Sequence, residues 1–289
     1  MRRSLLFIPG NNPAMLQNAD VFESDAIIID LEDAVSVSEK DSARNLVGYY
    51  LKSALENDLE KVIRINGLDT KYGLADLKAV VSDKIDTIML PKANVEDVKR
   101  LGEILAGLEK ERGMKKKIGI IPIIELASSV LETEKIAKQN RISGMLLGAE
   151  DLTTDLGIER TKTGSEILFP RFQVIYACAA NKIDAIDTPF TDTKDEIGLS
   201  ADCKIAAELG MNAKTCIHPN QVETVNKYFS PSQKLIDWSL RVMEAQKKAE
   251  GNGLGVFSLD GKMVDKPIID RAKKVLAKAA KFKITWEKK

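Results

Sequence analysis

The sequence predicts an α/β fold, a (β/α)8 TIM barrel with a C-terminal helical and hairpin extension. Eight short runs rich in Ile, Val and Leu alternate with longer amphipathic, charged stretches, a pattern typical of buried parallel strands joined by crossover helices. Nearly every run also ends in polar side chains, at the position where a barrel collects its active-site residues. An open doubly wound sheet is the competing fold, but its common forms have fewer strands. We therefore expect a barrel over residues 1–230 and an extension over residues 231–289.

The individual elements follow from this alternation. The expected strands are Ser4–Ile8, Ala26–Leu31, Lys61–Ile65, Thr87–Leu90, Ile118–Ile124, Gly144–Leu147, Asp184–Ile186 and Lys214–Ile217. The expected helices between them are at about Ser38–Leu55, Asn94–Arg112, Glu125–Gln139, Glu166–Lys182 and Lys194–Leu209. Beyond the barrel, apolar periodicity predicts helices over Pro231–Glu250 and Pro267–Lys281. Between these helices, Asp260-Gly261 predicts a tight hairpin that joins Val256–Leu259 to Lys262–Val264.

Composition excludes several classes of function. Lys and Arg total 43 and Asp and Glu total 43, so the chain lacks the positive charge of a nucleic-acid or anionic-membrane binder. The strongest apolar run, Ile118–Ile124, is much shorter than a membrane-spanning helix, and the run after Arg2-Arg3 is too short for an export signal. Three cysteines without C-x-x-C spacing indicate a reducing compartment. We expect a cytoplasmic protein without nucleic-acid or membrane partners.

Two carboxylates are candidates for a magnesium site. Glu125 directly follows the fifth strand, and Asp151 follows the sixth, so a barrel would bring them together on adjacent strand ends. Mg²⁺ prefers oxygen ligands and is commonly held by one or two protein carboxylates. An equally good interpretation is that Glu125 caps the following helix and that Glu150-Asp151 is a solvated loop. The carboxylate count does not separate Mg²⁺ from Mn²⁺.

Arg64 ends the third strand and is a candidate anion-binding group. Its guanidinium could enter the barrel mouth and bind a substrate carboxylate through two hydrogen bonds. The alternative, a structural ion pair with the acidic group Asp30, Glu32 and Asp33 on the preceding strand, is slightly favoured. The two interpretations are compatible.

Three other features have plain structural explanations. His218, the single histidine, could be a general base, but it stands before Pro219 where helix capping explains it equally well. The run Gly251-Asn252-Gly253-Leu254-Gly255 follows a helix rather than a strand, which favours a helix end and connector over a phosphate loop. The cysteines fall within expected helices or strands and are expected to be small buried residues: Cys178, Cys203 and Cys216.

The sequence resembles the citrate lyase beta-subunit family, within the superfamily that includes malyl-CoA and citramalyl-CoA lyases. The resemblance covers nearly the whole chain and depends on these motifs: Arg2-Arg3-Ser4, Phe7-Ile8-Pro9-Gly10-Asn11, Asp30-Leu31-Glu32-Asp33-Ala34-Val35, Arg64-Ile65-Asn66, Leu90-Pro91-Lys92, Gly148-Ala149-Glu150-Asp151 and Gly261-Lys262-Met263-Val264-Asp265. The sequence departs from the family at Pro170, which we expect to interrupt the helix around Glu166 and Arg171.

The resemblance implies a Mg²⁺-dependent oxo-acid lyase that cleaves a citryl thioester on an acyl carrier protein into oxaloacetate and an acetyl thioester. It implies that Glu125 and Asp151 hold the metal, that Glu125 and Arg64 contact the substrate, and that Arg64 binds its carboxylate. It also implies that the extension closes the active site of a neighbouring subunit in a homo-oligomer, with Asp265 as the acid that protonates the departing enolate.

Two other functions remain open at this point. One is a free-standing lyase of malyl-, citramalyl- or citryl-CoA on the same scaffold. Copurification with an acyl carrier protein and a transferase subunit would favour the citrate lyase hypothesis over this one. The other is a non-catalytic barrel that serves as a scaffold subunit, against which the joint presence of Glu125, Asp151, Arg64 and Asp265 argues.

Overall fold

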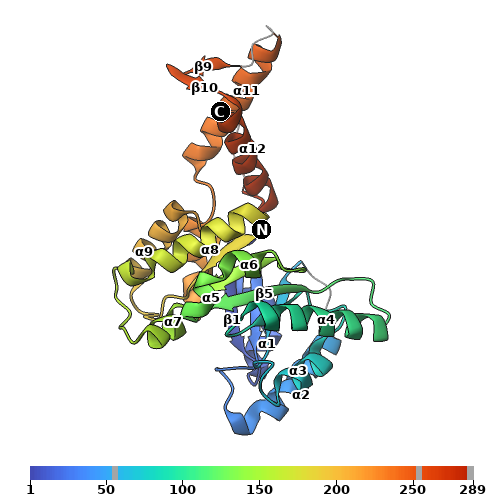
Figure 1. Ribbon diagram of the computed structural model, residues 1–289. Coiled ribbons are helices and arrows are strands. Elements are labelled where there is room, and N and C mark those ends of the chain that lie inside the picture. Colours follow the sequence, from blue (N-terminus) through green and yellow to red (C-terminus); the bar gives the residue numbers. More distant parts are fainter. Residues whose placement is uncertain (54–57, 252–255, 285–289) are drawn as a thin grey trace. The chain divides into compact units, whose positions relative to one another are not determined.

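The computed structural model describes residues 1–53, 58–251 and 256–284 (Figure 1). The chain divides into two compact units, Met1–Phe229 and Ser230–Lys289. Within the described residues, none of the helices combines the length and the apolar character that a membrane crossing requires.

The first unit is a closed barrel of eight parallel strands, which confirms the predicted fold. Each strand pairs with the next in sequence, and β1 closes the ring by pairing with β8 through Ser4, Leu5 and Leu6. The strands are β1 Ser4–Pro9, β2 Ala26–Asp30, β3 Glu60–Arg64, β4 Thr87–Leu90, β5 Gly119–Ile124, β6 Gly144–Leu147, β7 Asp184–Asp187 and β8 Ala213–Cys216.

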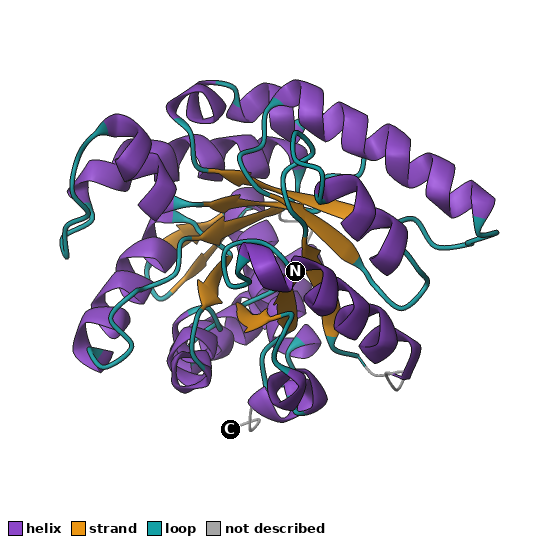
Figure 2. Ribbon diagram, turned by 90° about the horizontal axis from the view of Figure 1, so that it is seen from below, coloured by secondary structure: helices purple, strands orange, loops and turns teal. Residues whose placement is uncertain are grey.

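Helices surround the strands on the outside of the barrel (Figure 2). The α-helices are α1 Pro13–Gln17, α2 Lys40–Ser53, α3 Gly73–Val80, α4 Val95–Glu111, α5 Ala127–Leu131, α6 Thr133–Ala137, α7 Ala149–Leu156, α8 Leu168–Asn181, α9 Glu196–Leu209 and α10 Val222–Tyr228. Short 3-10 helices are η1 Ala19–Phe22, η2 Val37–Glu39, η3 Ser165–Ile167 and η4 Pro219–Gln221.

Two expectations about these helices are wrong. The helix expected over Glu125–Gln139 is two short helices, α5 and α6, because the helical path breaks at Glu132. Pro170 does not interrupt α8, since it lies in the first turn of that helix, where the missing proline N–H has no intrahelical partner to lose. Leu55, the expected end of the first long helix, lies outside the described residues.

Alternation along the strands separates two apolar layers. Side chains of one parity fill the barrel interior: Leu5, Ala26, Ile28, Val62, Met89, Ile121, Ile123, Leu146, Ile186 and Ala213. Their neighbours, such as Leu6, Ile27 and Ile29, point outward and pack in the larger cluster beneath the helices. Because successive strand residues face opposite sides, this alternation also decides which polar side chains at the strand ends enter the barrel mouth.

The second unit consists of α11 Gln233–Gly251, α12 Lys266–Lys281 and the hairpin β9 Phe257–Leu259 with β10 Lys262–Val264. Asp260 and Gly261 both have positive φ angles, 52° and 74°, as the predicted Asp-Gly turn requires. Its small core contains Val242, Val264, Ile269 and Ala272. Residues 252–255 of the glycine run lie outside the described residues.

Candidate active site

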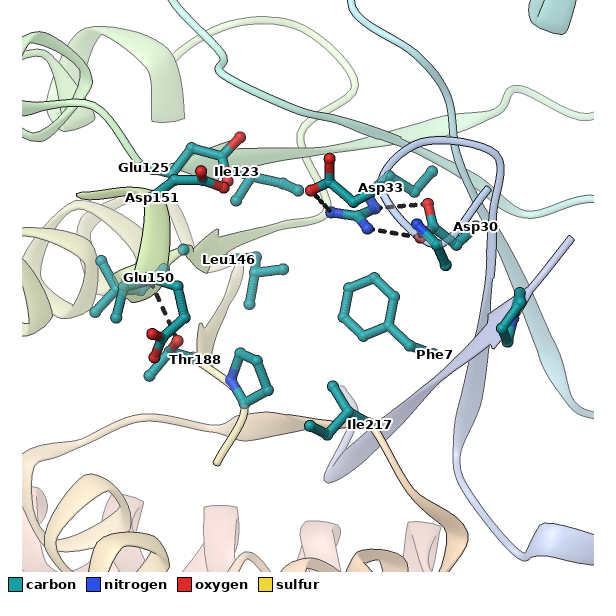
Figure 3. Close-up of a pocket in the computed structure, with 17 residues that line it drawn as sticks. Phe7, Asp30, Asp33, Ile123, Glu125, Leu146, Glu150, Asp151, Thr188 and Ile217 are labelled. Atoms are coloured by element: carbon teal, nitrogen blue, oxygen red, sulfur yellow. Dashed lines mark hydrogen bonds and ion pairs between the residues drawn. The ribbon is translucent and has the colours of Figure 1, made fainter. Parts of the chain in front are cut away.

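A cavity of about 430 Å³ opens at the carboxyl ends of the barrel strands (Figure 3). Its lining comes from the ends of β1, β2, β3, β5, β6, β7 and β8. Alternate residues of each strand point into the barrel, and this alternation continues to the strand ends. The polar side chains that it turns inward there line the cavity: Asp30, Arg64, Glu125 and Thr188. The structure therefore brings Glu125, Asp151 and Arg64 into one site.

Glu125 is buried at the end of β5, with 3% of its surface exposed. One carboxylate oxygen, Oε1, accepts a 2.5 Å hydrogen bond from the backbone N–H of Lys92. Lys92 has a left-handed φ of 46°, an uncommon conformation for a lysine. The alternative that Glu125 caps the next helix is wrong, because α5 begins at Ala127 with Leu126 at its N-cap.

Asp151 lies in the first turn of α7, so Glu150-Asp151 is not a solvated loop. The pKa of Glu125 is raised to about 8, mainly by burial and also by the nearby Asp151 carboxylate, although the hydrogen bond from the Lys92 N–H lowers it. Gly148 permits this arrangement, since a Cβ there would lie 2.6 Å from Oε2 of Glu125. A glycine at the start of α7 thus leaves room for the Glu125 carboxylate.

Arg64 makes the ion pairs that its alternative interpretation predicts, and its guanidinium also lines the cavity. Nε and Nη2 donate to the two carboxylate oxygens of Asp30 at 2.7 and 2.6 Å. Nη1 lies 3.0 Å from Glu32 and 3.5 Å from Asp33. The ring of Phe7 lies 5.0 Å from the guanidinium carbon. A guanidinium has five N–H groups. Asp30 takes one from Nε and one from Nη2, and Nη1 faces Glu32 and Asp33, which leaves the second Nη2 N–H for a ligand.

The site contains more acid than base. Arg64 pairs with Asp30, Glu32 and Asp33, and the carboxyl groups of Glu125 and Asp151 line the same cavity. Burial also raises the pKa of Glu32, which means that its negative charge is poorly stabilised. In the described parts of the chain, no group of three acidic, histidine or cysteine side chains is placed to hold a metal. Glu125 and Asp151 line the same cavity, and a set of two carboxylates fits Mg²⁺, which leaves its other positions to water and substrate oxygens.

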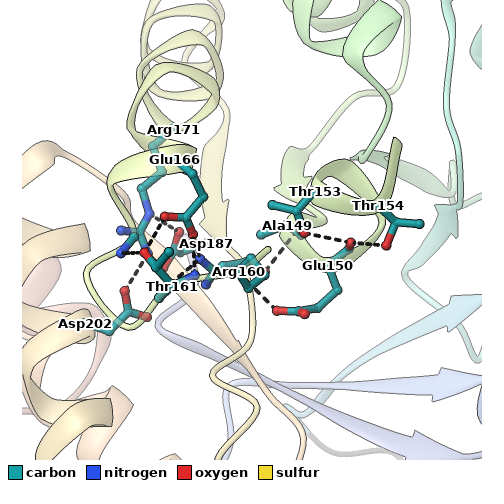
Figure 4. Close-up of polar contacts among 12 residues, drawn as sticks. Ala149, Glu150, Thr153, Thr154, Arg160, Thr161, Glu166, Arg171, Asp187 and Asp202 are labelled. Carbon is teal, nitrogen blue, oxygen red and sulfur yellow. Dashed lines mark hydrogen bonds and ion pairs between the residues drawn. The ribbon is translucent and has the colours of Figure 1, made fainter. Parts of the chain in front are cut away.

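Glu150 also lines the cavity but its carboxylate is engaged elsewhere (Figure 4). Arg160 binds it through Nε at 3.1 Å and also forms an ion pair with Glu166. Glu166 in turn accepts hydrogen bonds from the backbone N–H and hydroxyl of Thr161, at 3.1 and 2.6 Å. These contacts fix the segment that follows α7.

A buried network of four charged groups lies behind the cavity, between the barrel wall and two helices. Asp187 of β7 and Asp202 of α9 pair with Arg171 of α8 and Lys214 of β8. Arg171, Asp187 and Lys214 are fully buried. This network is not among the candidates that the sequence predicted, although a lysine and an arginine inside segments that must be buried are a signal for it.

The other candidate residues have structural contacts. Asp265 belongs to the second unit, where it is the N-cap of α12 and accepts a hydrogen bond from Ile268 N. Nδ1 of His218 accepts from the N–H of Asn220 and caps η4, as the capping interpretation predicted. The three cysteines are buried, as expected. Burial raises the pKa of Cys178 and Cys203 to about 12 and also raises that of Cys216.

Comparison with known proteins gives consistent matches along the chain. The family model described as HpcH/HpaI aldolase/citrate lyase matches residues 3–219. The citrate lyase subunit beta of Haemophilus influenzae is 40% identical over 282 residues, which cover 96% of this chain and 97% of that protein.

Two solved structures from Mycobacterium tuberculosis are similar over most of the chain. The protein CitE in complex with magnesium, acetoacetate and coenzyme A has a TM-score of 0.78 and 29% identity, and the match covers 96% of this chain and 98% of that one. A citrate lyase beta subunit complexed with oxaloacetate and magnesium has a TM-score of 0.68 and 29% identity, with coverage of 80% and 97%.

Proposed function

Because the chain belongs to the HpcH/HpaI aldolase/citrate lyase family, we propose that it cleaves the carbon–carbon bond of a citryl thioester. The products are oxaloacetate and an acetyl thioester, and the chain works as the beta subunit of a citrate lyase. The observation that carries this proposal is the pair of Glu125, which is buried, and Asp151, which is partly exposed, in the same cavity lining as Arg64. The oxaloacetate and magnesium bound to a relative of 29% identity support it.

The metal that this site would hold is Mg²⁺, with Glu125 and Asp151 as its protein ligands. When bound, Mg²⁺ supplies Lewis-acid chemistry, which lowers the pKa of the substrate hydroxyl and orients that hydroxyl with its neighbouring carboxylate. The carboxyl excess at the site supports the assignment. Burial and then the neighbouring carboxylates disfavour the charged form of Glu125, and a divalent cation would stabilise that charged form.

The remaining steps, orientation of the substrate and protonation of the enolate, are assigned to residues of the chain. Arg64 orients a carboxylate of the substrate with the N–H groups that Asp30 does not use. In the cleavage step the hydroxyl proton passes to water, the C–O bond becomes the keto group of oxaloacetate, and the bond to the adjacent methylene carbon breaks and leaves its electron pair on the thioester enolate. Asp265 then donates a proton from its carboxyl oxygen to that carbon. We assign Asp265 to the site of a neighbouring subunit, which makes the enzyme a homo-oligomer.

The carrier of the thioester separates two versions of this function. In the first version the citryl group is bound to an acyl carrier protein, and the chain works with that carrier and a transferase subunit. In the second the isolated chain acts on coenzyme A thioesters, a version favoured by the coenzyme A in the complex of the similar protein CitE.

The test is the release of oxaloacetate from citryl-CoA by the purified chain, with and without added Mg²⁺ after treatment with a chelator. We expect release only with the metal. Faster turnover of the citryl group on acyl carrier protein supports the first version, and efficient turnover of citryl-, malyl- or citramalyl-CoA supports the second. No cleavage of any of these thioesters, with the metal present, contradicts the proposed function.

A further inference from the structure

The helix that carries Asp151 begins without a capping side chain of its own. Gly148 is the N-cap of α7 and has no side chain to offer. A larger residue does not fit at this position, because its Cβ would lie within 3.0 Å of Glu125 and of Ile123. The first N–H groups of a helix have no partner within the helix, and Ala149 is completely buried. Its N–H therefore needs an acceptor from elsewhere in the fold.

Thr188, directly after β7, supplies that acceptor. Its hydroxyl oxygen accepts a hydrogen bond of 3.2 Å from the N–H of Ala149, 39 positions earlier in the chain (Figure 3). Thr188 is fully buried and lines the cavity. The Thr188 side chain, directly after β7, thus accepts a hydrogen bond from the first turn of α7, as an N-cap serine or threonine does in other helices.

The position of Thr188 is itself fixed by the buried charge network. Nζ of Lys214 donates to the Thr188 carbonyl oxygen at 2.5 Å and to Asp187 and Asp202 at 2.7 Å each. Lys214 has no exposed surface. A continuous series of hydrogen bonds therefore runs from this network through Thr188 to the first turn of α7.

We propose that Thr188 is a positioning residue for the metal site. The inference rests on the proposed function, in which Asp151 is a metal ligand two residues after Ala149 in the same helical turn. Without the Thr188 hydroxyl, the Ala149 N–H is buried without a partner and the first turn of α7 shifts to find one. Removing groups that orient metal ligands commonly costs 10- to 100-fold in metal affinity.

The test compares Mn²⁺ binding, measured by electron paramagnetic resonance of the free ion, in the full chain and four variants. Thr188→Val removes the acceptor and keeps the shape, and Thr188→Ser keeps the acceptor. Thr215→Val is the matched control, because the buried Thr215 hydroxyl on β8 donates at 3.2 Å to the carbonyl oxygen of Asp187, the residue before Thr188, rather than accepting from the Ala149 N–H. Asp151→Ala reports the loss of a ligand.

We expect Thr188→Val to bind Mn²⁺ roughly 10- to 100-fold more weakly than the parent, while Thr188→Ser and Thr215→Val keep the parental affinity. Equal affinity in Thr188→Val and the parent, or equal losses in Thr188→Val and Thr215→Val, overturns the inference and leaves the proposed function standing. A parent that binds no Mn²⁺ overturns both. If Thr188→Val does not fold, Thr188→Cys, with a weak sulfur acceptor, takes its place with the same expected loss and the same contradicting outcomes.

Discussion

Gly148 determines where the Glu125 carboxylate can lie. A methyl group at this position would approach Oε2 and Cβ of Glu125 to 2.6 and 2.7 Å. Gly148→Ala should therefore displace Glu125, weaken metal binding and lower the free energy of unfolding by about 1–3 kcal/mol. Gly107→Ala is the control, since nothing lies within 4 Å of its added Cβ on α4. Titration with Mn²⁺ and urea denaturation measure both effects, and parental metal affinity in Gly148→Ala would contradict the packing argument.

Arg64 combines an ion pair with a place in the cavity lining. Arg64→Lys keeps the charge but loses the paired hydrogen bonds to Asp30, because one ammonium group does not reproduce the guanidinium geometry. We expect kcat/KM for the thioester to fall by roughly 10²-fold. Steady-state kinetics of the purified parent and Arg64→Lys proteins measure this fall in kcat/KM. Unchanged kinetics would assign Arg64 to a purely structural role.

Some features of the site can be predicted from the sequence and others cannot. The positions of Glu125, Asp151 and Arg64 at strand ends are predictable, because strand order and side-chain alternation place them at one end of a barrel. Two hydrogen bonds of the site cannot be predicted in this way: the one from the Lys92 N–H to Glu125 and the one from the Ala149 N–H to the Thr188 hydroxyl. Those hydrogen bonds join residues 33 and 39 positions apart, and they depend on backbone details that apolar patterns do not report.

The strands and helices differ in how well the sequence predicts them. Buried strands such as β4 and β6 are continuous apolar runs and match the expected bounds. The apolar periodicity of the sequence does not reveal α3, α7 or α10 as helices. They have only seven or eight residues each, which is too short for a helical period to stand out. Tertiary contacts such as the Thr188 cap hold α7 in place.

The buried charge network between β7, β8, α8 and α9 should make the free energy of unfolding depend on pH. Burial alone would raise the pKa of Asp202, but the adjacent Lys214 ammonium and Arg171 guanidinium outweigh it and lower that pKa. A lowered carboxyl pKa adds stability that is complete above the unfolded-state value of about 3.9 and is lost as the pH falls through the folded-state value.

Asp202→Asn should therefore be less stable than the parent at neutral pH, with a difference that narrows as the pH falls below about 4. Urea denaturation at a series of pH values from 7 to 3 measures this difference. A difference that is constant across the acid range would show that the Asp202 charge does not contribute in this way.

Asp265, which we propose as the acid, belongs to the second unit, whereas Glu125 and Asp151 belong to the barrel unit. Asp265 is fixed locally by its capping contact with α12, whereas Glu125 and Asp151 are fixed by barrel closure. Asp265→Asn is a suitable variant, because asparagine is also a good N-cap but is no acid. If Asp265 protonates the enolate, this variant should lose roughly 10²- to 10⁴-fold in rate.

Subunit mixing tests whether Asp265 acts on a neighbouring subunit. Glu125→Gln subunits keep the acid and Asp265→Asn subunits keep the metal ligands, so hybrid oligomers should contain restored sites. With random exchange, about one quarter of the sites are intact. Hybrids that have exchanged subunits, verified by mass spectrometry, but recover no activity would contradict action between subunits.

We propose that Glu125 and Asp151 hold the metal on which thioester cleavage depends. The most direct measurement is the rate of oxaloacetate release from citryl-CoA against Mg²⁺ concentration for the parent, Glu125→Gln and Asp151→Ala, with circular dichroism to verify the fold. Because each variant loses an oxygen ligand at the cavity rather than a core contact, we predict folded proteins without Mg²⁺-dependent cleavage. Rates near that of the parent in both variants, at limiting Mg²⁺, would contradict the account.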